Sequence, residues 1–446
     1  MSDLLDPLFA SAEMAELFSD RGRLQGMLDF EVALARAEAK AGIIPESAVV
    51  SISVAGRADL IDAVDLAQAA ARAGNLAIPL VRQLTDLAGT EAGRYVHWGA
   101  TSQDAIDTGL ILQLRAALTL FERDLDRLDD ILAELADQHR ATLMAGRTLM
   151  QQAQPVTLGL KAAGWLDAAL RHGTRMRELR PRLLVVQLGG AAGTLAALGG
   201  DGMKVANLMA EELGLGCPDL PWHGHRDRLA ELATMLGLLT GTLGKIARDV
   251  SLLMQTEVAE AFEPAAHGRG GSSTMPHKHN PVGCAVTLAA ATRVPGLVAT
   301  MLSAMVQEHE RGLGGWHAEW ETLPEICRVA SGALNQMIAV LSGLRVDAIR
   351  MHDNLDATGG GVFAAAIAMA LAPTLGARPA HDLVEQACEQ AARQGRSLRR
   401  VLEATPDITA QLSAADFDRL FDPAGACGMA EAMIERVLAS YRARRG

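Results

Sequence analysis

A periodic run of aliphatic residues between positions 229 and 253 most constrains how this chain can fold. Its members recur at intervals of three and four residues: Leu229, Leu232, Leu236, Leu239, Leu243, Ile246, Val250 and Leu253. This spacing predicts one face of an α-helix that is roughly 37 Å long at about 1.5 Å per residue. Gly237, Gly241 and Gly244 interrupt the run, and each costs about 1 kcal/mol relative to alanine. We expect these glycines to offset that cost by letting neighbouring helices approach closely.

Other parts of the chain show the same helical period. A second apolar seam runs from Leu125 to Leu135. Aromatic residues make up only 3% of the chain whereas 49% of it is hydrophobic, so the core must be aliphatic and rich in alanine. Such a core suits closely packed helices and argues against aromatic-rich sandwiches or barrels. The period predicts further long helices over three stretches, the second of them kinked at a proline: residues 157–180, 284–311 (Pro295) and 325–345.

These patterns predict an all-α fold with three helical domains. Residues 109–350 are expected to form a central bundle of about five long helices, interrupted by a loop over residues 268–281. Residues 1–108 and 351–446 contain shorter helices broken by turns. Because the long helices would expose more apolar surface than one chain can cover, we expect an oligomer.

Charge, hydropathy and cysteine content exclude several classes of function. The 41 basic and 53 acidic residues give a net charge of -12, so the whole chain has no electrostatic basis for binding nucleic acid or an anionic membrane. The longest apolar run, 362–373, falls short of the roughly 18 residues of a membrane span. The N-terminus lacks a basic secretory-type region, and the five cysteines are far apart without a C-x-x-C pair. A cytoplasmic protein without structural zinc or disulfides is expected.

One glycine-rich stretch imitates a dinucleotide-binding loop. Residues 183–188 have the composition of a strand, and residues 189–193 follow with three glycines. However, Leu188 stands where the first glycine of G-x-G-x-x-G belongs, and no alternating strand–helix pattern surrounds it. No nucleotide cofactor is therefore expected.

The most unusual segment is the loop that carries Lys278. Residues 270–281 read Gly-Gly-Ser-Ser-Thr-Met-Pro-His-Lys-His-Asn-Pro, and glycine and proline bound the segment on both sides, which predicts a loop between two helices. Composition alone would also fit a flexible surface linker. The chain has only five lysines against 36 arginines, which makes a lysine in this loop less expected as a random surface cation.

This segment matches G-S-S-x-M-P-x-K-x-N-P, the signature of the fumarase/aspartase superfamily, and the chain resembles that superfamily over nearly its whole length. Residues 97–104, His-Trp-Gly-Ala-Thr-Ser-Gln-Asp, are similar to the family's first substrate-contact segment, and residues 146–148, Gly-Arg-Thr, to its second. The resemblance implies a homotetramer in which three chains contribute to each active site. It also implies chemistry at a carbon next to a carboxylate-activated C–H bond.

The resemblance assigns roles to the residues of these segments. Ser272 would be the base that takes or returns the carbon proton, and Lys278 and Asn280 would stabilise the doubly negative aci-carboxylate. A serine needs backbone amides and a cation to act in this way, and a glycine-led loop with a lysine can supply both. The remaining expected substrate contacts are His97, Thr101, Ser102, Arg147, Thr148, Gln151, Arg226, Ser273, Met275 and Arg311.

Several of these residues also have ordinary structural interpretations. Thr101 and Asp104 form a capping-box pattern that opens a helix over residues 103–117, and capping alone would account for them. The exposed N-terminus of such a helix can also bind a carboxylate. His97 and Arg147 could equally be structural.

Two departures from the lyase pattern narrow the range of reactions that the chain is expected to catalyse. Leu149 stands where the lyases of the superfamily carry a histidine, and Ala285 stands where they carry its glutamate partner. That pair helps to protonate an amine or hydroxide leaving group, a contribution of about 10²- to 10⁴-fold. A carboxylate, with a pKa of about 4, can leave unprotonated. Loss of both residues therefore favours a reaction that adds or expels a carboxylate oxygen, which is a lactonisation.

The chain resembles the cycloisomerase subfamily that lactonises carboxylated muconates in protocatechuate breakdown. The stretches that carry this similarity are residues 187–195, 221–228, 308–311 and 316–320. The substrate would be a small tricarboxylate: one carboxylate attacks the alkene, the negative charge moves onto a second, and Arg311 or Arg226 holds the third. Ser272 would donate the proton to carbon, and neither a metal nor a cofactor is expected.

Two other functions stay open at this point. One is an adenylosuccinate- or argininosuccinate-type lyase that releases fumarate, against which Leu149 and Ala285 argue. The other is a non-enzymatic structural or storage protein, for which an intact signature would be unnecessary. The preference among 3-carboxy-, 3-sulfo- and unsubstituted muconates is also left open.

Overall fold

The structure is a computed structural model that describes residues 4–265, 270–271 and 274–445. The fold is all-α, as predicted, and the strands that it describes form only two short antiparallel pairs. The chain divides into two compact units, each assembled from separated segments. Unit 1 comprises residues 1–125, 172–244 and 286–336, and unit 2 comprises residues 126–171, 245–285 and 337–446.

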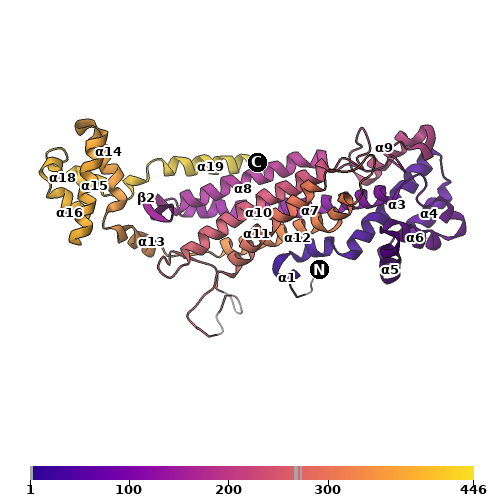
Figure 1. Cartoon of the computed structure of the whole chain (residues 1–446), viewed down its shortest axis with the longest axis horizontal. Helices are drawn as coiled ribbons and strands as arrows, with labels where there is room; N and C mark the ends of the chain where they lie inside the picture. Colours follow the sequence, from indigo (N-terminus) through magenta and orange to yellow (C-terminus); the bar gives the residue numbers. More distant parts are fainter. Residues whose placement is uncertain (1–3, 266–269, 272–273, 446) are drawn as a thin grey trace. The chain divides into compact units, whose positions relative to one another are not determined.

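The five long helices predicted from the apolar period are present (Figure 1). Each of them contributes residues to both units. They are α7 (Ser102–Gln138), α8 (Leu158–Leu183), α10 (Asp227–Leu253), α11 (Val282–Ser303) and α12 (Gly315–Ser342). The periodic residues of α10 are all buried, the most exposed of them at 4%. The seam that defined this helix in the sequence therefore forms core. The three-domain boundaries themselves stay a prediction.

Two glycines of α10 do allow a close approach of α11, as expected. A Cβ atom on Gly244 would lie 2.6 Å from Cβ of Ala291, and one on Gly237 would lie 3.0 Å from a methyl group of Val298. Gly241 differs, because no described atom would lie within 4 Å of its Cβ. Its face of the helix is exposed.

Some helix boundaries differ from those predicted. The helix expected over residues 103–117 and the second apolar seam belong to one continuous helix, α7. Helix α11 ends at Ser303 rather than at residue 311, and α12 begins already at Gly315. The segment between them is a loop that includes Arg311. Periodicity extended α11 too far because apolar residues continue into this loop.

Shorter helices complete unit 1. They are α1 (Asp6–Phe9), α2 (Ala12–Leu17), α3 (Asp20–Ala41), α4 (Glu46–Ala55), η1 (Ala58–Leu60), α5 (Ala63–Ala73), α6 (Ala77–Ala92), η2 (Gly93–Tyr95), η3 (Ala196–Asp201) and α9 (Gly202–Leu213). Helix α3 packs against α4 and α9, and α6 packs against α4 and α5 (Figure 1). Serine side chains cap the N-termini of α2 and α3, and glycine in the left-handed conformation ends α3, α5 and α9.

Unit 2 contains the described strands and the C-terminal helices. They are β1 (Leu143–Thr148), β2 (Gln151–Thr157), β3 (Ala261–Phe262), β4 (Arg345–Val346), α13 (Ala348–Leu355), η4 (Asp356–Thr358), η5 (Gly361–Phe363), α14 (Ala364–Leu375), α15 (Ala377–Gln394), α16 (Leu398–Glu403), α17 (Pro406–Thr409), α18 (Ala414–Leu420), η6 (Gly425–Cys427) and α19 (Ala430–Arg445). Helices α14 to α18 enclose a hydrophobic core of their own. The β1–β2 hairpin was not predicted.

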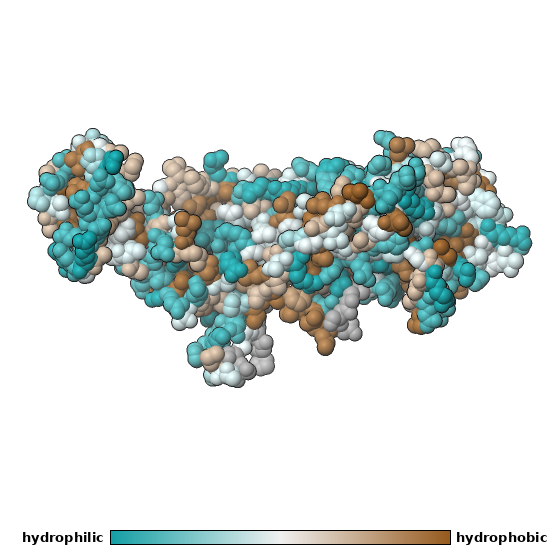
Figure 2. Space-filling model, in the orientation of Figure 1, coloured by the Kyte–Doolittle hydropathy of each residue, from teal (hydrophilic) through white to brown (hydrophobic). Residues whose placement is uncertain are grey.

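Helices α10 and α11 are each long and apolar enough to cross a membrane by length and composition alone. The expectation that residues 362–373 form the longest such candidate was therefore wrong. Alanine, glycine and threonine keep the mean hydropathy high over a long helix even where no uninterrupted apolar run occurs. Of its most apolar window, α10 buries 61% inside the chain but α11 only 33%. On the face shown in Figure 2, hydrophobic residues interrupt the hydrophilic surface over the long helices.

Candidate active site

The first substrate-contact segment lies in unit 1, at the start of α7. Asp104 accepts a hydrogen bond from the backbone N–H of Thr101 at 3.0 Å, which is one half of the predicted capping box. The same carboxylate accepts the backbone N–H groups of Gly189 and Gly190, both at 3.0 Å. Asp104 therefore fastens the glycine-rich loop to the helix end that carries Thr101 and Ser102.

The glycine-rich loop thus has a structural role at this helix end. His223 contacts Asp104 through Nε2 at 2.6 Å and is itself buried. A side chain at Gly189 would meet the His223 ring and Pro221 at 2.8 Å. Gly190 has a φ of +66°, a conformation that favours glycine, and lies against the backbone of Gly99. Close approach and positive φ explain the glycines that imitated a cofactor motif.

Arg311 belongs to the same cluster. Its guanidinium donates to the backbone carbonyls of Gly190 at 3.3 Å and Ala191 at 3.0 Å. The side chain is only partly buried. Unit 1 therefore brings together the first contact segment, the glycine-rich loop and Arg311.

The structure argues against a substrate-binding role for Arg226. Its side chain is 1% exposed and lies between two carboxylates, 2.7 Å from Asp107 and 2.6 Å from Glu319. Burial lowers the pKa of Arg226, but the charges and hydrogen bonds of these carboxylates outweigh that effect and raise it. Trp316 also donates to Asp107, at 3.1 Å. Arg226 is thus a core residue that directly precedes α10 and joins it to α7 and α12.

His97 has two unusual features. Its φ is +60°, which is uncommon for a residue other than glycine. Its Nδ1 lies 2.6 Å from the carboxylate of Glu31 on α3, a buried residue that sequence analysis did not single out. Glu31 could not be recognised from the sequence, because its partner, His97, lies 66 residues further along the chain.

The second contact segment lies in unit 2, on the β1–β2 hairpin. Arg147 makes a bidentate ion pair with Glu260, which is fully buried, and Thr148 and Gln151 close the turn as a cross-strand pair. Both of the latter residues are exposed. The guanidinium of Arg147 is therefore already engaged by a carboxylate of its own chain.

The signature loop also belongs to unit 2. Ser272 and Ser273 lie outside the described residues, so their predicted roles stay predictions. Lys278 and Met275 are exposed, and Asn280 is partly buried. The backbone N–H of Asn280 donates to the carbonyl of Gly270 at 2.7 Å, so that two ends of the signature pair with each other.

A carboxylate holds the base of this loop. Glu263, which is buried, accepts the backbone N–H groups of Gly283 at 3.1 Å and Cys284 at 2.8 Å. These amides lie in the first turn of α11, where backbone N–H groups have no partner within the helix and a carboxylate is favourable. Glu263 therefore fixes the end of the loop to the start of the helix, a role that the sequence did not reveal.

The two positions of the missing relay are both on the surface of the chain. Leu149 is 97% exposed and, with Met150, forms a two-residue hairpin turn in which both φ angles are positive, +49° and +66°. Ala285 is exposed in the first turn of α11. Within this chain, neither residue packs into an apolar core.

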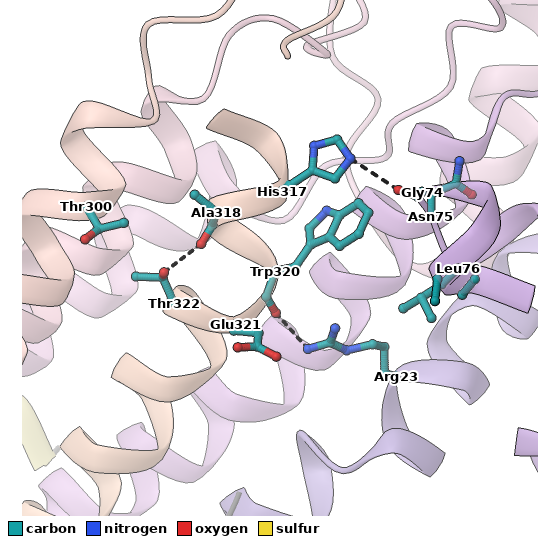
Figure 3. Close-up of a pocket in the computed structure, with 12 residues that line it drawn as sticks. Arg23, Gly74, Asn75, Leu76, Thr300, His317, Ala318, Trp320, Glu321 and Thr322 are labelled. Carbon is teal, nitrogen blue, oxygen red and sulfur yellow. Dashed lines mark hydrogen bonds between the residues drawn. The ribbon is translucent and has the colours of Figure 1, made fainter. Parts of the chain in front are cut away.

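A cavity of about 660 Å³ lies in unit 1 among α3, α5 and α12 (Figure 3). Arg23 donates to the carbonyl of Trp320 at 2.7 Å, and the His317 ring lies 3.3 Å from the carbonyl oxygen of Gly74. These contacts join the walls of the cavity. Its described lining includes none of the predicted site residues. It therefore offers no support for the predicted chemistry.

Comparisons with known proteins agree with the motifs. The family described as "Lyase" matches residues 9–296, and "Adenylosuccinate lyase C-terminus" matches residues 360–437. The chain is 59% identical to the 3-carboxy-cis,cis-muconate cycloisomerase of Pseudomonas aeruginosa, over 99% of this chain and 97% of that protein. It is 57% identical to the Pseudomonas putida protein of the same name, over 94% and 100%.

A solved structure gives the same result for the fold. The crystal structure of 3-carboxy-cis,cis-muconate lactonizing enzyme from Pseudomonas putida matches with a TM-score of 0.95 at 54% identity, and the match covers 100% of both chains. Motifs, fold and sequence relatives therefore agree, and the chain belongs to the fumarase/aspartase superfamily of lyases.

Proposed function

We infer that the chain is a cycloisomerase that lactonises 3-carboxy-cis,cis-muconate to 4-carboxymuconolactone, a step in protocatechuate degradation. The names of the most similar proteins support this reaction. The observation that carries it is the joint replacement of the lyase relay by Leu149 and Ala285 in a chain that keeps the whole signature. A lyase that expels an amine needs the relay, whereas a lactone-forming cycloisomerase whose reacting group is a carboxylate does not.

The reaction forms one C–O bond and moves one proton. A carboxylate of the muconate attacks the internal alkene carbon, and the electron pair of the alkene moves onto a neighbouring carboxylate to give an aci-carboxylate. Lys278 and Asn280 stabilise that charge as preorganised donors. Ser272 then donates a proton to carbon, which regenerates the carboxylate.

Arg311 is the residue that we propose for the third carboxylate. Its side chain is partly exposed and uses one of its terminal nitrogens to contact the loop carbonyls of Gly190 and Ala191. Arg226, by contrast, is held on both sides by buried carboxylates. A planar guanidinium suits bidentate recognition of a carboxylate.

The direct test is the ultraviolet absorbance of the substrate. Purified protein mixed with 3-carboxy-cis,cis-muconate should remove the diene absorbance, and the product should be the lactone by NMR. Release of fumarate from adenylosuccinate or argininosuccinate, with no loss of the muconate signal, would support the lyase instead. Comparing initial rates on 3-carboxy-, 3-sulfo- and unsubstituted muconate fixes the substrate preference.

We also propose that the chain is a homotetramer whose active sites combine segments of different copies. The apolar surface of α11 supports this, since only 33% of its most apolar window is buried inside its own chain. Exposed Leu238 and Gly241 on α10 form a second such surface, and the Leu149–Met150 tip is a third. Large exposed apolar patches on a helix are typical of surfaces that another protein covers.

The compartment that we propose is the cytoplasm. None of the five cysteines is in a disulfide, and the two buried ones, Cys284 and Cys327, lie on α11 and α12. Buried cysteines outside disulfides suit a reducing compartment. The apolar helices are then part of a protein core and an oligomer interface, and no membrane or nucleic-acid partner is required.

A further inference from the structure

His97 is held by a carboxylate from a distant helix. Glu31 lies in the middle of α3, is 2% exposed, and approaches the Nδ1 atom of His97 at 2.6 Å. A carboxylate only accepts hydrogen bonds, so Nδ1 must carry the proton. That assignment leaves Nε2 as the ring atom available to another molecule, and the side chain of His97 keeps 18% of its surface exposed.

The surroundings of the ring favour its protonated form. Burial by itself lowers the pKa of His97, but the charge of Glu31, its hydrogen bond and the charge of Asp104 on α7 together outweigh burial and raise it. Among the described residues, Glu31 on α3 and Asp104 on α7 are the charged groups that raise the pKa of His97. Asp104 is in turn engaged by His223 and by two backbone amides.

The backbone at His97 also has an uncommon conformation. Its φ of +60° lies in the left-handed region, which histidine accepts more readily than leucine but which is still held in place by the surrounding structure. The Glu31 contact contributes to this, because it joins the segment to the α3 helix. One oxygen of Glu31 is buried without a hydrogen-bond partner among the described residues. The contact with His97 is therefore the hydrogen bond that compensates the burial of the Glu31 carboxylate.

We propose that Glu31 is a positioning residue for the lactonisation: through Nδ1 it holds His97 as an imidazolium that offers its Nε2–H to a carboxylate of the substrate. This proposal rests on the proposed function, since it requires a polyanionic substrate at the first contact segment. The trianion would gain a charge-assisted hydrogen bond there, which is stronger than a neutral one. The effect belongs mainly to substrate binding, and so to KM rather than to kcat.

The test is the pH dependence of turnover of 3-carboxy-cis,cis-muconate by the full-length Glu31→Gln variant between pH 6 and 9. Glutamine keeps the shape and can still accept from Nδ1, but it removes the charge that favours the imidazolium. The alkaline limb of kcat/KM should move down by about one pH unit or more, so that kcat/KM falls about tenfold at pH 8 and little at pH 6. Glu31→Asp, which keeps the charge, should lie between Glu31→Gln and the parent.

Glu38→Gln is the matched control. Glu38 lies two turns further along α3, is buried, and has no hydrogen-bond partner for either oxygen among the residues described. Burial and the charge of Glu31 raise its pKa to about 9, so it is neutral over most of the tested range and its replacement removes no charge. This variant should keep the parental limb below pH 8.5. A purely structural effect of changing a buried α3 glutamate would instead appear in both variants.

His97→Gln provides an independent check if Glu31→Gln folds poorly. The pH profile of kcat/KM for His97→Gln should lack the alkaline limb although Glu31 is intact. Adding Glu31→Gln to this variant should lower kcat/KM no further. A parental pH profile in Glu31→Gln, or additive losses in the double variant, would overturn the positioning role. Failure of the parent protein to consume the muconate at any pH would instead reject the proposed function.

Discussion

Arg147 donates from both terminal nitrogens to the buried carboxylate of Glu260, with 2.8 Å between Nη1 and Oε2. Asn354 donates to the same carboxylate at 2.7 Å. Glu260 directly precedes β3, from which the chain enters the signature loop. The pair therefore joins the hairpin of the second contact segment to the root of that loop.

This pairing predicts that Arg147 contributes to stability as well as to turnover. Arg147→Met leaves Glu260 buried with Asn354 as its remaining partner, and removing one member of a buried pair costs roughly 3 kcal/mol. The double variant Arg147→Met/Glu260→Met should lose less than Arg147→Met alone, because no buried charge is left behind. Urea unfolding measures the stability of both variants. Unchanged stability of Arg147→Met with lost turnover would mean that the guanidinium serves the substrate only.

The signature residues should behave in the opposite way. Lys278→Ala and Ser272→Ala are each expected to lower turnover at least about 100-fold, typical of removing one charge-stabilising or acid–base group. Stability should be unchanged for Lys278→Ala, since its side chain is exposed. His277→Ala, the exposed neighbour without an assigned role, is the control and should turn over normally. Steady-state kinetics and thermal unfolding of the three variants decide the assignment.

Glu38 predicts a pH dependence of stability. Burial, and then the charge of Glu31, raise the pKa of Glu38 to about 9 from an ordinary 4.5. Between these values the folded state keeps a proton that the unfolded state has lost, so stability falls as the pH rises from about 4.5 through about 9. Glu38→Gln should flatten this slope, by on the order of 1 kcal/mol per pH unit. Unfolding free energies at pH 5.5, 7 and 8.5 test this, and a slope equal to that of the parent would contradict it.

The parts of the fold that the sequence predicted are those that local periodicity determines. The seam from Leu229 to Leu253 specifies α10 because each apolar residue needs only its neighbours along one helix to define a face. The signature loop was equally recognisable, since its residues are contiguous. The hairpin was missed because Leu149 and Met150 occupy positive-φ turn positions that asparagine or glycine usually takes.

The parts that the sequence could not predict depend on contacts between distant segments. Nothing local distinguishes the buried Arg226 from the partly exposed Arg311, because the difference lies in Asp107 and Glu319, 119 and 93 residues away. Glu31 escaped prediction for the same reason. An isolated acidic residue on a helix becomes informative only when the fold supplies its partner.

The exposed face of α10 predicts an oligomer interface. Gly241 has no described atom within 4 Å of the position of its Cβ, and Leu238 on the same face is 52% exposed. If this face meets another copy, Gly241→Leu should shift the assembly to smaller species in light scattering. Ala392→Leu, which adds a leucine to an exposed position of α15, is the control and should leave the mass unchanged. A tetramer that tolerates Gly241→Leu would place the interface elsewhere.

Restoring the relay tests whether the reaction uses a general acid, and the geometry of Leu149 indicates that the substitution there should not disturb folding. Leucine at a φ of +49° is strained, and histidine and asparagine accept this region more readily, so Leu149→His should fold at least as well as the parent. Ala285→Glu places a carboxylate in the first turn of α11, where the helix dipole favours it. Neither change therefore confounds activity with misfolding.

If the reacting group is a carboxylate, restoring the relay as Leu149→His with Ala285→Glu should not accelerate lactonisation. We expect a loss, because a new carboxylate near a trianionic substrate is repelled strongly where water is scarce. Ala285→Glu alone should be the slower single variant, since no histidine then partners its charge. Leu149→Asn relieves the same backbone strain without supplying an acid, so it separates the effect of the turn from that of the relay. Steady-state rates on 3-carboxy-cis,cis-muconate decide the matter: a double variant several-fold faster than both the parent and Leu149→Asn would show that the reaction uses a general acid at this position, and the distinction from the lyases would fail.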